Sequence, residues 1–220
     1  MNKSMRQLAV AVLLTCPISA FAGNWGLDVH AGTLGGGMQA SYVINPYLST
    51  RLLFNRYNYD YTGTKEQINY DFTLHLESYA AMLDWHPFAG IFRVSAGYFS
   101  NKNELDALGQ PQNGNYIING TTYSASQVGT LTGVISFRSY VPYLGIGWST
   151  LGTSSTGLGF EFDLGALFQG SPSAKLSASG SLANNPQFQS DLAQEQDQLQ
   201  NDVNFFKVYP VVTIGLSFRF

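Results

Sequence analysis

The sequence has 220 residues, enough for one or two domains, but its 11 basic and 14 acidic residues make up only 11% of the chain. Soluble globular proteins carry roughly 25%. Glycine (23 residues), aromatic residues (14%) and uncharged polar residues take the place of the missing charges, which argues against both a helical membrane protein and a disordered chain. An all-β protein remains, as either a secreted sandwich or a membrane barrel.

Residues 1–22 have the pattern of a cleaved secretory signal peptide. Lys3 and Arg6 precede a short apolar core, and the segment ends in a small-x-small cleavage site, Ala-Phe-Ala. The apolar core is too short for a membrane anchor, and the neighbours of Cys16 suit lipid attachment poorly. We therefore expect residues 23–220 to form the mature protein, which has no cysteine and hence neither disulfides nor cysteine ligands.

Eight segments of the mature chain alternate apolar and polar residues between turn signals, as barrel strands do. They are 25–31, 39–44, 48–61, 71–85, 90–99, 135–148, 157–168 and 210–220. The first two flank a turn expected at Gly35-Gly36-Gly37, although 25–44 could also be one glycine-kinked strand. An even number suits a closed bacterial barrel with both termini in the periplasm. The sequence therefore predicts an eight-stranded antiparallel transmembrane β-barrel with long extracellular loops and a short helix in the last loop.

The connections sort by length into two sets. Short periplasmic turns are expected at 45–47, 87–89 and 149–156, and long extracellular loops at 62–69, 101–129 and 169–204. Within the long loops, 116–123 predicts a hairpin around Asn119-Gly120, and 186–203 predicts an amphipathic helix that starts at a proline. The acidic face of this helix either attracts cations or is simply solvated; it carries Asp191, Glu195, Asp197 and Asp202.

The last segment ends in Thr213-x-Gly215-x-x-Phe218-x-Phe220, with apolar side chains on one parity. This ending resembles the C-terminal signal of bacterial outer-membrane proteins, which the barrel assembly machinery recognises. The alternative is the final strand of a periplasmic sandwich. The C-terminal signal and the signal peptide together predict a protein in the outer membrane of a Gram-negative bacterium, surrounded by lipid and lipopolysaccharide.

Alternation assigns a network of charged and titratable side chains to the barrel lumen. Its members are Asp28, His30, Arg51, His75, Glu77, Arg93, Arg138, Glu161, Asp163 and Arg219. Because side chains fill the interior of an eight-stranded barrel, these paired charges would close it as a structural plug. The alternative is a narrow polar path for a small charged solute. On the same strands, alternate tyrosines at 57, 59 and 61 suit an aromatic girdle at the membrane interface.

No catalytic, metal or cofactor site is predicted. His30, His75 and Glu77 could bind a metal or move a proton, but we interpret the histidines as members of a hydrogen-bond network. The sequence has no phosphate-binding loop, and no basic run suits nucleic acid.

Three stretches resemble the CarO-like outer-membrane proteins: Gly114-Asn115-x4-Asn119-Gly120-x2-Tyr123, then 141–147, then 165–176, and the Asn-Pro-Tyr turn at 45–47 is similar. The resemblance is firmest from Gly114 onward. It implies a small barrel associated with uptake of ornithine or basic amino acids and with carbapenem susceptibility. We therefore expect a narrow channel or uptake protein for small solutes, with cationic, amino-acid-like solutes as candidates. The alternative is a closed structural or adhesive barrel with a salt-bridged lumen.

Overall fold

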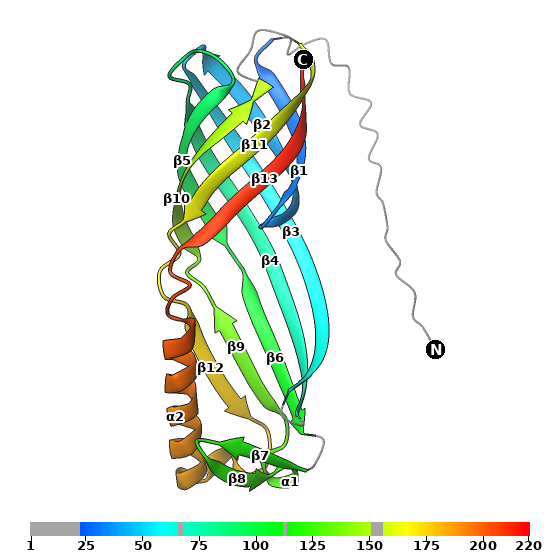
Figure 1. Ribbon diagram of the computed structural model, residues 1–220, viewed down its shortest axis with the longest axis vertical. Helices are drawn as coiled ribbons and strands as arrows, with labels where there is room; N and C mark the ends of the chain where they lie inside the picture. Colours follow the sequence, from blue (N-terminus) through cyan, green and yellow to red (C-terminus); the bar gives the residue numbers. More distant parts are fainter. Residues whose placement is uncertain (1–22, 66–67, 112–113, 151–155) are drawn as a thin grey trace, which may run out of the picture.

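The structure is a computed structural model that describes residues 23–65, 68–111, 114–150 and 156–220, so the predicted signal peptide lies outside the described residues. Eight antiparallel strands close into a barrel (Figure 1): β1 (Trp25–Gly32), β2 (Gly35–Asn45), β3 (Leu48–Lys65), β4 (Ile68–Trp85), β5 (Phe92–Asn101), β10 (Tyr140–Ser149), β11 (Gly157–Leu167) and β13 (Tyr209–Arg219). Their order is β4-β3-β2-β1-β13-β11-β10-β5, and β5 pairs back with β4 to close the ring. The predicted eight-stranded barrel is confirmed.

Strands β3 and β4 are much longer than the others and leave the barrel. Each has 18 residues, whereas the other barrel strands have between 8 and 11. Beyond the barrel, β4 pairs with β6 (Glu104–Pro111). β6 pairs in turn with β9 (Leu131–Ser136), and β9 pairs with β12 (Ser173–Ala178) at the edge of the sheet. We call this curved extension the distal sheet. Figure 1 shows it below the barrel, at the end opposite the C-terminus.

Helix α2 (Pro186–Val203) runs beside β12 at the edge of the distal sheet. The side chains of Gln196 and Gln200 accept hydrogen bonds from the backbone N–H groups of Leu176 and Ala174, both at 3.0 Å. Exposed strand edges are templates for pairing with other chains. The helix therefore protects the edge of the sheet by occupying its free donors.

The far end of the distal sheet is closed by a small hairpin and its own apolar core. The hairpin consists of β7 (Asn115–Ile118) and β8 (Thr121–Ser124), and α1 (Ala125–Val128) and the 3-10 helix Ser181–Asn184 lie nearby. The fully buried residues of this core come from the hairpin, α1 and α2: Tyr116, Ile118, Val128, Phe188 and Leu192. The predicted hairpin and the predicted helix 186–203 are both confirmed.

Several expected loops contain strands instead. Most of 62–69 continues β3 and β4, the loop 101–129 contains β6, and the loop 169–204 contains β12. The turn expected at Gly35-Gly36-Gly37 lies instead at Thr33-Leu34, and the three glycines belong to β2. These expectations were wrong because the added strands do not face lipid, so the apolar alternation used to find membrane strands does not mark them. Most of the predicted turn 149–156 lies outside the described residues.

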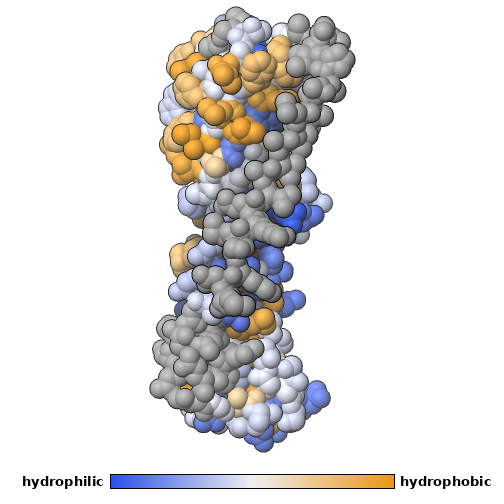
Figure 2. All heavy atoms as spheres, turned by 90° about the vertical axis from the view of Figure 1, so that its right-hand side faces the viewer, coloured by the Kyte–Doolittle hydropathy of each residue, from blue (hydrophilic) through white to orange (hydrophobic). Residues whose placement is uncertain are grey.

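The outer wall of the barrel is an apolar belt. Its exposed side chains include Leu27, Val29, Met38, Leu52, Leu83, Tyr98, Leu144, Leu158, Phe160, Ile214, Leu216 and Phe218. Figure 2 shows hydrophobic side chains gathered over the barrel half of the molecule and hydrophilic ones over the distal half. An apolar surface this large is foreign to a soluble monomer and matches a lipid environment. No helix in the described part of the chain is long and apolar enough to cross a membrane.

In the distal sheet the arrangement is the reverse of that in the barrel: the apolar side chains lie on the inner face and the polar ones on the outer face. The register between β3 and β4 runs without interruption from Leu48↔Trp85 to Lys65↔Ile68, so inward parity continues past the barrel. Tyr57, Tyr59 and Tyr61 therefore have the same parity as the buried Arg51 and lie on the inner, concave face. The predicted lipid-facing girdle is wrong for these tyrosines, because in water the apolar face of a sheet turns inward.

The hairpin is held to α2 by a hydrogen bond that responds to pH. The Tyr123 hydroxyl donates to the buried carboxylate of Asp191 at 2.5 Å, and this bond lowers the pKa of Asp191 below its ordinary range. Since the pKa is lower in the folded than in the unfolded chain, the carboxylate favours docking at neutral pH, and this contribution is lost as pH falls through the folded pKa.

We expect acidification from about pH 5 to about pH 2 to loosen the packing of the hairpin on α2. Near-UV circular dichroism of the tyrosines should report the change. In Tyr123→Phe the docking should be weaker at pH 5 and change less on acidification, whereas the exposed Tyr140→Phe should behave as wild type. A Tyr123→Phe profile identical to that of wild type would contradict this role for the hydrogen bond.

Candidate functional site

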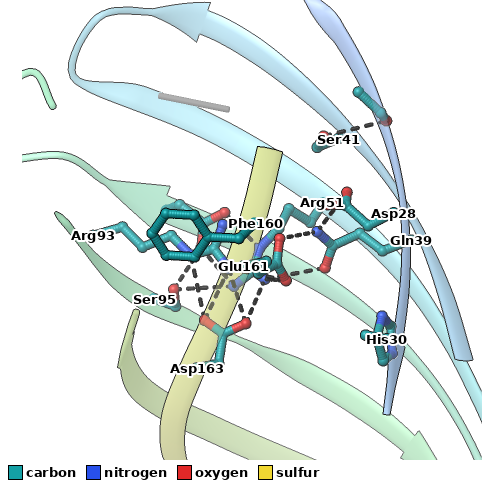
Figure 3. Close-up of polar contacts among 12 residues, drawn as sticks. Asp28, His30, Gln39, Ser41, Arg51, Arg93, Ser95, Phe160, Glu161 and Asp163 are labelled. Atoms are coloured by element: carbon teal, nitrogen blue, oxygen red, sulfur yellow. Dashed lines mark hydrogen bonds and ion pairs between the residues drawn. The ribbon is translucent and has the colours of Figure 1, made fainter. Parts of the chain in front are cut away.

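A layer of buried ion pairs connects strands across the barrel interior (Figure 3). Arg51 of β3 lies 2.6 Å from Asp84 of β4 and 3.1 Å from both Glu161 and Asp163 of β11. Arg93 of β5 lies 3.1 Å from Glu161 and 2.9 Å from Asp163. All five side chains are at most 6% exposed. We call this group, together with Asp28, Gln39 and Ser95, the charged layer.

Two neutral side chains complete the charged layer. Gln39 donates from Nε2 to Asp28 at 3.1 Å and to Glu161 at 2.8 Å, and its Oε1 accepts from Arg51 at 3.0 Å. Ser95 donates to Asp84 at 2.5 Å and accepts from Arg51 at 3.1 Å. Such connections satisfy polar groups that burial would otherwise make costly.

The charges in this layer do not balance. Two guanidinium groups, from Arg51 and Arg93, face four carboxyl groups, from Asp28, Asp84, Glu161 and Asp163. Asp28 is 3% exposed, and within the described part of the chain its Oδ1 has no hydrogen-bond partner. Because surplus buried negative charge is unfavourable, this arrangement favours an additional proton or cation.

An apolar layer closes the lumen between the charged layer and the distal sheet. It consists of Leu34, Ala80, Met82, Phe99, Val141, Tyr143, Leu167 and Val211. Leu34 comes from the two-residue turn between β1 and β2, and the ring of Tyr143 lies over Gly145 and Gly165, where a Cβ atom would collide with it. A void of about 10 Å³, lined in part by Arg51 and Leu34, lies between the two layers. It is about the size of one water molecule, so side chains fill most of the lumen at this level.

The structure brings together five of the ten residues assigned to the lumen network: Asp28, Arg51, Arg93, Glu161 and Asp163. His30 is also buried in the lumen, but its Nε2 lies 2.7 Å from the Asn55 side chain and not in an ion pair.

Three of the remaining four lie outside the lumen, which corrects their sequence assignment, whereas Arg219 has the parity of the buried Ser217 and lies at the end of the barrel, away from the charged layer. The polar outer face of the distal sheet carries His75, close to Asn58, and Glu77, which pairs with Lys102 at 3.0 Å. Arg138 is exposed beside Gly170, and Arg219 donates to the carbonyl of Gly23 at 2.6 Å. The alternative site of His30, His75 and Glu77 is therefore not formed. His75 and Glu77 lie on the part of β4 that belongs to the distal sheet, where polar side chains point outward.

Sequence reasoning missed Gln39, Asp84 and Ser95. Asp84 could have been found by reading β4 backwards from its turn, because the apolar residues Leu83 and Trp85 on either side of it mark the outer face. Among the residues that the structure describes, no cluster of His, Cys, Asp or Glu is arranged to hold a metal ion.

A trough follows the concave face of the distal sheet. At the mouth of the barrel, a cavity of about 330 Å³ is lined in part by Tyr57, Leu74 and Tyr209. Farther out, a cavity of about 260 Å³ lies between the sheet and α2, with Phe72 and Leu105 on its wall. Since Phe72 and Leu74 alternate on the same face of β4, the two cavities are neighbours. We call them together the distal trough.

Neither a protein-family model nor a curated protein matches the sequence. Two solved structures are similar to this one. The crystal structure of CarO from Acinetobacter baumannii shares 21% identity over 89% of this chain and 97% of that chain, with a TM-score of 0.56. That of CarO2 from the same organism shares 19% identity over 91% of this chain and 100% of that chain, with a TM-score of 0.58. The resemblance to CarO-like proteins is thus confirmed for the fold: this eight-stranded barrel is similar to the CarO and CarO2 structures.

Proposed function

We propose that this protein lies in the outer membrane of a Gram-negative bacterium as a gated, narrow uptake barrel for small solutes, with a preference for cationic ones such as amino-acid-like cations. The observation that supports it best is the excess of carboxyl groups in the charged layer, with Asp28 incompletely hydrogen-bonded. A layer with surplus negative charge can attract and pass a cation.

In this proposal the distal trough faces the cell exterior, and the barrel end where Gly23 bonds to Phe220 faces the periplasm. The apolar layer is the gate. Leu34 is its most movable member, since it lies on the turn between β1 and β2 and not within a strand. The C-terminal strand, with Thr213, Gly215, Phe218 and Phe220, would be read by the barrel assembly machinery during insertion into the lipopolysaccharide-containing membrane.

Planar-bilayer recordings test this function. We expect the wild-type protein to show small, discrete conductances with preference for cations, and Leu34→Ala to open several-fold more often because the apolar layer becomes thinner. Asp28→Asn should keep the conductance and lower the cation preference. Leu52→Ala, which removes the same number of atoms from the lipid-facing wall, should match the wild type.

A closed structural or adhesive barrel is the second candidate, and the packed lumen with its void of about 10 Å³ favours it. The two functions differ in one measurable outcome. If neither the wild type nor Leu34→Ala conducts, and neither admits small amines or amino acids into liposomes, the uptake function is wrong and the structural one is favoured.

A further inference from the structure

The outer cavity of the distal trough has the features of a built binding site. Its volume is about 260 Å³, slightly below the roughly 300–1,000 Å³ of pockets for drug-sized ligands. Large side chains form the walls, among them Phe72, Leu105, Ile135, Leu176 and Leu199. Small residues line it as well: Ala107, Gly109 and Gly133, and Ala107 and Gly133 lie directly opposite each other on β6 and β9. The cavity therefore suits a flat, apolar body of one or two rings.

One charged group lies at this cavity. Glu195 of α2 is the single charged side chain among the described residues that line it. Its Oε2 accepts a hydrogen bond from the backbone N–H of Asn119 at 2.9 Å, which fixes the carboxylate beside the β7-β8 hairpin. Because the side chain is only half-buried, a ligand can reach it. The site is thus complementary to a molecule with an apolar body and one positive charge.

We propose that the outer cavity of the distal trough binds small amphipathic amines. The ring system lies over Ala107 and Gly133, and the ammonium group pairs with Glu195. This pairing would be a charge-assisted hydrogen bond, the stronger kind in proteins. Binding at this site depends on the distal sheet and α2 and does not require that the barrel conducts. The proposal therefore goes beyond the proposed uptake function and can be right or wrong independently of it.

Three indole compounds of similar size and different charge test the site: tryptamine (cationic), tryptophol (neutral) and indole-3-acetate (anionic). Affinities are measured by isothermal titration calorimetry on the full protein in lipid nanodiscs, with empty nanodiscs as reference. We expect tryptamine to bind tightest and indole-3-acetate weakest. Glu195→Gln, which keeps an oxygen for the Asn119 N–H, should weaken tryptamine about tenfold or more and leave tryptophol unchanged.

Two further variants separate charge from shape. Asp197→Asn removes an acid from an exposed position on the same helix and should leave all three affinities unchanged. Gly133→Leu should abolish binding of all three, because even a Cβ at this position would lie 3.3 Å from the Leu176 side chain. Since this variant could disturb the sheet, Leu199→Trp on the α2 wall of the cavity is a second blocking variant, and the far-UV circular dichroism spectrum checks the fold of both.

Several outcomes would overturn the proposal. It is wrong if the folded wild-type protein binds none of the three compounds, or if indole-3-acetate binds as tightly as tryptamine. It is also wrong if Asp197→Asn weakens tryptamine as much as Glu195→Gln does, or if both correctly folded blocking variants still bind. The uptake function is tested by bilayer conductance and this site by binding affinities. The two proposals can therefore fail separately, and the measurements show which one has failed.

Discussion

Replacement of Arg51 by methionine is expected to destabilise the barrel by about 3–5 kcal/mol. The guanidinium group is 1% exposed and pairs with Asp84, Glu161 and Asp163. Methionine fills much of the same volume but leaves three buried carboxylates with Arg93 as the remaining guanidinium partner in this layer. Breaking a buried ion network from one side is costly because the remaining charges cannot regain their hydration.

The free energy of unfolding can be measured by urea titration in lipid vesicles, with tryptophan fluorescence as the signal. Arg56→Met is the matched control, since Arg56 lies on the same strand with the opposite parity and is exposed. It should cost about 1 kcal/mol or less. If both variants lost the same free energy of unfolding, the expected difference between the buried inner face and the exposed outer face of β3 would be wrong.

Phe188→Ala is expected to unfold the docked end of α2 while the barrel stays closed. Phe188 is fully buried and packs edge-on against Tyr123, with a ring-centroid distance of 5.0 Å. Truncation of a buried phenylalanine costs about 3–5 kcal/mol, and the core of the distal end is small and separate from the barrel interior. The lost packing should therefore release α2 and the β7-β8 hairpin locally.

Limited proteolysis should then cleave Phe188→Ala rapidly within 180–206, while the protein still migrates as a folded barrel on unboiled SDS gels. Phe205→Ala is the control, because Phe205 is 73% exposed. It should be cleaved at the wild-type rate. If Phe188→Ala also loses the folded gel mobility, the distal end and the barrel form one cooperative unit, contrary to this expectation.

Local sequence features predicted the elements whose signals are local. The last strand shows alternation over its whole length, the hairpin has Asn119-Gly120 in left-handed backbone conformations, and α2 starts at the expected Pro186 after its Asn185 cap. Each of these depends on neighbours within about ten residues. Low charge and lipid-facing alternation were sufficient for the closed eight-stranded barrel, because a bilayer admits few other β structures.

Only the tertiary structure decided which face of each strand points inward beyond the barrel, and which charges meet. Alternation alone cannot distinguish an apolar face turned toward lipid from one turned toward a protein interior, so Glu77 was assigned to the lumen although it lies on the outer face. The membership of Asp84 and Gln39 in the charged layer follows from the register of six strands at once. The distal trough likewise depends on pairings between segments far apart in the chain, such as β9 with β12. The amino-acid sequence thus determined the barrel and its local elements, and long-range pairing, which sequence periodicity does not encode, determined the charged layer and the trough.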